Sequence, residues 1–163
     1  MIKGRAWVFG DHINTDLIIP GRYLDDYSSK NLAAHVMEDA DPEFPRKVAK
    51  GDIVVAGRNF GCGSSREQAP LALKHAGVSA VVAGSFARIF YRNAINVGLP
   101  VITCANAASR ITPGEEIGID LHGGWIQLPS GERLSFSPLP DFLIRILDEG
   151  GLVPYTRKRL QGR

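Results

Sequence analysis

The chain has 163 residues, of which 44% are hydrophobic and 22% charged, and its formal net charge is +2. This length and composition fit a single globular domain, 1–163, with one sizeable core. The small net charge argues against nucleic-acid binding, and no apolar run reaches the ~20 residues of a membrane-spanning helix. The basic cluster of Arg157, Lys158 and Arg159, with Arg163 at the end, is interpreted as a solvated tail.

Cysteine and histidine usage predicts no metal site on this chain. Cys62 and Cys104 are too few for a zinc or iron–sulfur site, and the four histidines lack metal-ligand spacing. The first residues, MIKGRAWVFGDH, become polar too soon for a signal peptide. We therefore expect a cytoplasmic protein whose metal chemistry, if any, comes from a partner.

The first third of the chain mixes apolar runs with turn formers. Residues 4–9 are typical of a strand, and a second apolar strand is expected between the polar residues 14–16 and Pro20. Residues 24–31 are polar and rich in turn formers, which predicts a loop. A helix around Leu32 is expected next.

The middle of the chain alternates strands and helices. Helices are expected over 64–76 and over 85–98, the second with Ile89 and Asn93 in its apolar stripe. Strands covered on both faces are expected at three continuous apolar runs, 52–57, 79–84 and 99–104. This alternation predicts a parallel sheet.

After Pro113 the pattern changes to short strands parted by glycine turns, EEIGID, GWIQL and RLSF, which predicts an antiparallel unit. A last helix, PDFLIRILDEGG, is expected to pack Phe142 against the core and to end at Gly150. The expected fold class is α/β, a parallel central sheet with helices plus a smaller antiparallel β unit.

Residues 57–68, GRNFGCGSSREQ, have two explanations. Ser64 and Glu67 have the spacing of a capping box that begins a helix. Alternatively, Gly61 and Gly63 let the backbone approach a ligand. The turn follows a strand of the parallel sheet, where such folds bind ligands, and a helix start offers N–H groups to an anion. The chemistry favours an anion site and leaves capping open.

The side chains of this turn suit an anion. Arg66 presents a guanidinium fork that matches a carboxylate or phosphate, Ser65 can donate a hydrogen bond, and Ser64 is a candidate nucleophile or base. Elsewhere, Arg88 and Arg92 lie one helical turn apart and fit a solvated helix face, unless a partner protein covers them.

Four segments in order carry a family resemblance: FGDHINTDLIIPGRYL, GDIVVAGRNFGCGSSREQAPLALK, SFARIFYRNAINVGLP and ILDEGGLVPY. They resemble the small subunit of the 3-isopropylmalate dehydratase and homoaconitase group, the detached swivelling domain of the aconitase superfamily. The resemblance implies a swivelling β/β/α fold, no cofactor on this chain, and a separate large subunit that carries a 4Fe–4S cluster. It also implies a dehydration and rehydration that moves a hydroxyl between adjacent carbons of a malate derivative.

By motif position, the resemblance assigns Ser64 as the general base that takes the carbon-bound proton. Ser65 and Arg66 match the substrate-binding pair, and Asp16 matches a site aspartate beside Thr15. On this reading residues 14 to 16 line the active site, although alone they fit a simple turn. A serine alkoxide needs strong stabilisation at neutral pH, which we expect from the helix start and Arg66.

In this group, the loop after PGRYL contacts the variable arm of the substrate, and here it reads Asp25, Asp26, Tyr27 and Ser28. Two acidic residues would repel a third carboxylate, which favours 3-isopropylmalate, in leucine biosynthesis, over homoaconitate, in lysine biosynthesis. Another small diacid (citraconate, maleate or dimethylmalate) and a non-catalytic anion-binding module are the remaining alternatives.

Overall fold

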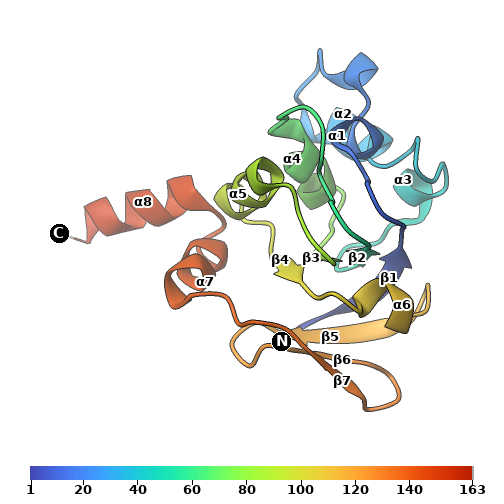
Figure 1. Cartoon of the computed structure of the whole chain (residues 1–163). Helices are drawn as coiled ribbons and strands as arrows, with labels where there is room; N and C mark the ends of the chain where they lie inside the picture. Colours follow the sequence, from blue (N-terminus) through green and yellow to red (C-terminus); the bar gives the residue numbers. More distant parts are fainter. Residues whose placement is uncertain (163) are drawn as a thin grey trace.

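The computed structural model describes residues 1–162 (Figure 1). Its sheet contains seven strands in the order β4-β3-β2-β1-β5-β6-β7. The strands are β1 (Ile2–Val8), β2 (Ile53–Ala56), β3 (Ala80–Ala83), β4 (Val101–Thr103), β5 (Glu116–Asp120), β6 (Trp125–Gln127) and β7 (Arg133–Ser135). The helices are α1 (Thr15–Ile18), the 3-10 helix η1 (Gly21–Tyr23), α2 (Ser29–His35), α3 (Phe44–Lys47), α4 (Gln68–His75), α5 (Arg88–Asn96), α6 (Ala107–Arg110), α7 (Asp141–Asp148) and α8 (Leu152–Gln161).

Strands β1 to β4 pair in parallel, as the alternating pattern predicts. Successive side chains of β2 and β3 point to opposite faces. Val54 and Val81 belong to the apolar cluster under the helices, whereas Ile53 and Val82 belong to a second cluster with β5, β6 and β7. Both faces are therefore buried, which explains the uninterrupted apolar runs.

Strand β1 joins the parallel and antiparallel parts of the sheet. Its residues 6–8 pair in parallel with β2, while residues 2–5 pair antiparallel with β5. Figure 1 shows β5, β6 and β7 on one side of the parallel strands and helices α1, α2 and α4 on the other. The expected α/β class, with its parallel core and smaller antiparallel unit, is confirmed.

The predicted strand after residues 14–16 is wrong, because these residues begin helix α1. The Asn14 side chain accepts a hydrogen bond from the N–H of Leu17 at 2.8 Å and caps the helix. The expected loop 24–31 is also too long, since Ser28 caps α2 by accepting a hydrogen bond from the N–H of Asn31. In both places a helix begins at a residue whose side chain caps it, although the sequence pattern favours a strand or a loop there.

The helix expected from Ser64 starts four residues later, at Gln68, and the side chain of its N-cap residue, Glu67, makes no capping hydrogen bond. The capping-box hypothesis is therefore wrong. Pro70 gives the physical reason, because a proline has no N–H for the carbonyl four residues earlier and its ring clashes with that carbonyl. A proline is tolerated only in the first turn, so the helix begins close before it.

The basic residues 157–159 are exposed, as expected of a solvated segment, and they belong to a helix. Residues 152–161 form α8, although each is at least partly exposed, and Arg163 lies outside the described residues. Two residues expected in the core are exposed, Ile89 at 51% and Phe142 at 53%. Among residues 1–162, no helix has the length and apolar content to span a membrane.

We predict that Gly61→Ala destabilises the fold by about 2–4 kcal/mol, because two costs add. Gly61 has φ +81°, and a Cβ there would lie 2.3 Å from Cγ of Phe90 in α5. Gly131→Ala is the matched control, since Gly131 has φ +91° and no atom within 4 Å of the added Cβ. Its expected cost is about 1 kcal/mol. Urea unfolding measures both, and equal losses would contradict the predicted clash.

Candidate active site

The turns that follow β2 and β3 lie side by side and bring α5 to the glycine turn. The N–H of Phe60 donates to the Ser85 carbonyl at 3.0 Å, and the N–H of Ala87 donates to the Phe60 carbonyl at 2.9 Å. The next residue, Gly61, packs directly against Phe90. Only a residue without a Cβ permits this approach, so glycine sets the distance between the turn and the helix.

Thr15 attaches the serine-containing loop to the start of α1. Its side chain is buried, and the residue is 3% exposed. Its hydroxyl donates to the Ser64 carbonyl at 2.8 Å, while its N–H donates to the Cys62 carbonyl at 2.8 Å. Thr15 thus holds the backbone on both sides of Gly63 and orients the serines that follow.

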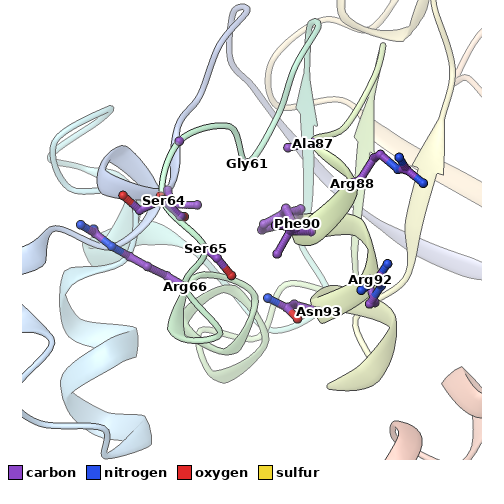
Figure 2. Close-up of a pocket in the computed structure, with 12 residues that line it drawn as sticks. Gly61, Ser64, Ser65, Arg66, Ala87, Arg88, Phe90, Arg92 and Asn93 are labelled. Carbon is purple, nitrogen blue, oxygen red and sulfur yellow. The ribbon is translucent and has the colours of Figure 1, made fainter.

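A pocket of about 490 Å³ lies between this loop and α5 (Figure 2). One wall includes Thr15, Ser64, Ser65 and Arg66, and the other includes Arg88, Ile89, Phe90, Arg92 and Asn93. Among the described residues, three arginines and no carboxylate line the pocket. Its electrostatic potential therefore favours an anion.

Ser64 and Ser65 are both exposed to solvent in this pocket. Within residues 1–162, the N–H groups of Ser64, Ser65 and Arg66 donate no hydrogen bond to a backbone carbonyl. These N–H groups lie before α4 rather than in its first turn, so the attraction that they exert on an anion comes from the loop and not from the start of the helix. Two hydroxyls and unpaired N–H groups make the loop suitable for binding a negatively charged oxygen.

Arg66 and Asp16 pair with each other. Nη1 of Arg66 donates to Oδ1 of Asp16 at 3.0 Å and to the Ile19 carbonyl at 3.1 Å. The hydrogen bond from Arg66, with a second one from the N–H of Gly21, lowers the pKa of Asp16 below its usual 3.8. The pair is therefore ionised at neutral pH, and acid breaks it only below that usual value.

The pair also determines the direction of the guanidinium. Figure 2 shows Arg66 directed away from α5, whereas Ser65 is directed toward it. The Arg66 side chain is 20% exposed, and its Nη2 lies beside Gly21, where η1 begins. Arg66 therefore connects the pocket to the segment that leads into the 24–28 loop.

The four residues proposed as a specificity loop, 25–28, are exposed and do not line the pocket. Asn31 holds the loop closed, because its amide donates to the carbonyls of Tyr23 at 2.9 Å and Asp26 at 2.7 Å. Arg22 is bound to Glu38 and Asp39, at 2.9 and 2.8 Å. It is therefore not free to bind a substrate carboxylate.

The Aconitase C-terminal domain family model matches residues 11–107. The chain belongs to this family. The matched range contains the Thr15 and Asp16 segment, the glycine turn, the serine pair and all of α5. Every residue that lines the pocket therefore falls within the family domain.

Relatives of nearly equal length carry names with different substrates. The chain is 58% identical to 3-isopropylmalate dehydratase small subunit 1 of Methanopyrus kandleri, over 97% of this chain and 94% of that one. It is also 58% identical to the methanogen homoaconitase small subunit of Methanothermobacter thermautotrophicus, over 98% and 93%. A crystal structure of 3-isopropylmalate dehydratase from Methanocaldococcus jannaschii matches with a TM-score of 0.93 and 48% identity, covering 98% and 95%.

Sequence reasoning missed the α5 wall of the pocket. Ile89 and Asn93 were assigned to an apolar, core-facing stripe, yet both line the pocket. Arg88 and Arg92, interpreted as a solvated face, line it too. The sequence signal for this wall was Asn93, a polar residue inside an otherwise apolar stripe. An amide buried in a core needs a hydrogen-bonding partner, so its presence there suggests a ligand.

The described residues do not fit a metal site. Within residues 1–162, no group of three or more His, Cys, Asp or Glu side chains lies close enough together to hold a metal ion. Cys62 is partly exposed in the glycine turn, whereas Cys104 is buried in the cluster beneath the antiparallel strands.

We predict that Thr15→Val lowers the free energy of unfolding by about 1–2 kcal/mol, because the Ser64 carbonyl loses its donor. Thr15→Ser, which keeps the hydroxyl, is expected to retain most of this stability. Urea unfolding of the three chains measures the difference. If the valine variant is as stable as wild type, the hydrogen bond from the Thr15 hydroxyl does not hold the loop.

Proposed function

We propose that this chain is the small subunit of a hydro-lyase that interconverts 2-isopropylmalate and 3-isopropylmalate in leucine biosynthesis, in the cytoplasm. The observation that carries the proposal is the exposed serine pair in a pocket lined by three arginines and no carboxylate. The names of the Methanopyrus, Methanothermobacter and Methanocaldococcus relatives support a two-subunit dehydratase or isomerase.

Ser64 is the proposed general base. It removes the proton from the substrate carbon next to the hydroxyl-bearing carbon, the C–H electron pair forms the double bond, and the hydroxyl departs from the neighbouring carbon. Water then adds back in the opposite sense, with its hydroxyl on the carbon that lost the proton and its proton on the other carbon, which gives the isomer. The serine oxygen must act as an alkoxide, which the N–H groups of residues 64–66 and the positive pocket stabilise.

The other site residues hold the substrate in this scheme. Ser65 donates from the loop, and Arg66 offers the two guanidinium nitrogens that Asp16 does not engage. Thr15 acts through the Ser64 carbonyl, so we assign it a positioning role. Asp16 orients Arg66 through their ion pair.

The proposed partner is a large subunit that carries a 4Fe–4S cluster. The cluster supplies Lewis acidity for the departing hydroxyl when the two subunits are assembled. The present chain supplies the base and the hydrogen bonds around it. Because the pocket is open on this chain, the partner is also expected to close it and exclude water.

The proposed substrate follows from the 25–28 loop. Relatives named for isopropylmalate and for homoaconitate are equally similar, so identity does not separate the two substrates. Asp25 and Asp26 are exposed, and Arg22 is bound to Glu38 and Asp39. A third carboxylate near this loop would therefore meet two like charges, and the neighbouring Arg22 is already paired, which favours 3-isopropylmalate over homoaconitate.

We predict that Ser64→Ala lowers kcat of the reconstituted two-subunit enzyme by about 10³-fold, because the proton acceptor is lost. KM is expected to change less than about threefold, since Ser65 and Arg66 still bind the substrate. Ser130→Ala, in the turn between β6 and β7, is the control and should leave both constants unchanged.

A decrease in kcat of less than tenfold would contradict the role of Ser64 and favour a non-catalytic anion-binding module. The isolated chain provides a second check. It should show no turnover of 3-isopropylmalate, and activity without the large subunit would contradict the two-subunit proposal.

We predict that the reconstituted enzyme has a higher kcat/KM for 3-isopropylmalate than for homoaconitate. Asp25→Arg should raise the relative kcat/KM for homoaconitate by about tenfold, because it replaces repulsion by attraction. Asp141→Arg, at the start of α7 and far along the chain from the loop, is the charge-matched control. A preference of the wild-type enzyme for homoaconitate would show that the substrate assignment is wrong.

A further inference from the structure

Asn93 is an unusual residue for its position in α5. It is the sixth residue of a nine-residue helix, where asparagine is less favourable than alanine by about 0.5–0.7 kcal/mol. It is partly buried and lines the pocket. A polar side chain at such a position normally finds a hydrogen-bonding partner.

The side chain faces the serine loop across the pocket. Figure 2 shows the amide of Asn93 and the hydroxyl of Ser65 directed toward one another from opposite walls. Both residues line the same pocket. A ligand oxygen between the two walls would accept hydrogen bonds from both of them.

The charges on the α5 wall identify the kind of ligand. Arg88 and Arg92 lie on the same helix, and the ion pairs within residues 1–162 include neither of them. Arg66 is paired with Asp16 through Nη1 and is directed away from this wall. The α5 side of the pocket therefore combines unpaired positive charge with a neutral amide that has two donors, which suits a carboxylate.

We propose that Asn93 is a substrate-binding residue that, with Ser65, holds one carboxylate of the hydroxy diacid beside Ser64. This inference deepens the proposed function and rests on it for the identity of the substrate. The two walls then have separate tasks. The Arg66 side of the loop faces η1 and the variable arm, while the Asn93 side holds a carboxylate that every substrate of this class shares.

The test is the binding of succinate to the reconstituted complex, measured by calorimetry. Succinate has two carboxylates, as the substrate does, but no hydroxyl to eliminate, so its binding can be measured without turnover. Asn93→Asp has nearly the same shape and places a negative charge in the pocket, and it should weaken binding at least tenfold. Asn96→Asp, on the same helix and outside the pocket, should bind within about twofold of wild type.

Asn93→Ala separates binding from folding. Alanine is the better helix former, so the variant should be at least as resistant to urea as wild type. It should nevertheless bind succinate about three- to tenfold more weakly and raise KM with kcat within about threefold. A structural asparagine would show the reverse, a loss of stability with unchanged binding.

Succinate affinity within twofold of wild type for both Asn93 variants would overturn the inference. The proposed function is tested separately, by measuring the turnover of 3-isopropylmalate by the wild-type complex. A complex that binds succinate through Asn93 but turns over no hydroxy diacid would contradict the proposed function and leave the binding residue in place.

Discussion

The site depends on the attachment of the glycine turn to the segment that leaves β1. The hydrogen bonds of this attachment include three around the serine pair: the N–H of Gly61 donates to the Ile13 carbonyl, the N–H of Thr15 to the Cys62 carbonyl, and the Thr15 hydroxyl to the Ser64 carbonyl. They join two segments that lie almost 50 residues apart in the chain. Because β1 and β2 are neighbouring parallel strands, both segments leave the sheet at the same edge.

This attachment explains why the serine loop needs no helix to position it. Helix α4 begins only at Gln68, after the loop has already been fixed from the α1 side. The contact between Gly61 and Phe90 fixes it from the α5 side. The loop is therefore held on two sides while its hydroxyls and N–H groups face solvent, an arrangement suited to binding an anion without large rearrangement.

The strands of the sheet were predictable from the sequence, whereas several helix limits and one whole helix, α1, were not. Continuous apolar runs identify strands buried on both faces, and β2, β3 and β4 lie where these runs occur. The short helix α1 was missed because its apolar residues also fit a strand, and only the cap by Asn14 distinguishes the two. The start of α4 was misplaced because the spacing of Ser64 and Glu67 favours an earlier start, which Pro70 prevents.

The same contrast applies to the site. The serine pair and Arg66 were predicted as site residues because glycine turns and hydroxyl or guanidinium groups have recognisable sequence signals, and the roles of Thr15 and Asp16 followed from the family resemblance. The pairing of Arg66 with Asp16, and the pocket wall that contains Asn93, depend on which distant segments the fold brings together. Local spacing contains no information on such contacts, so they had to come from the structure.

The position of β1 affects how the protein can be divided. The family model spans residues 11–107, but the sheet is completed by β1 before that range and by β5, β6 and β7 after it. A fragment cut at those limits would lose the strand that lies between β2 and β5 and would expose an unpaired edge of β2. Shortened versions of the protein should therefore extend beyond the range of the family model and retain Ile2 to Val8 together with the antiparallel strands.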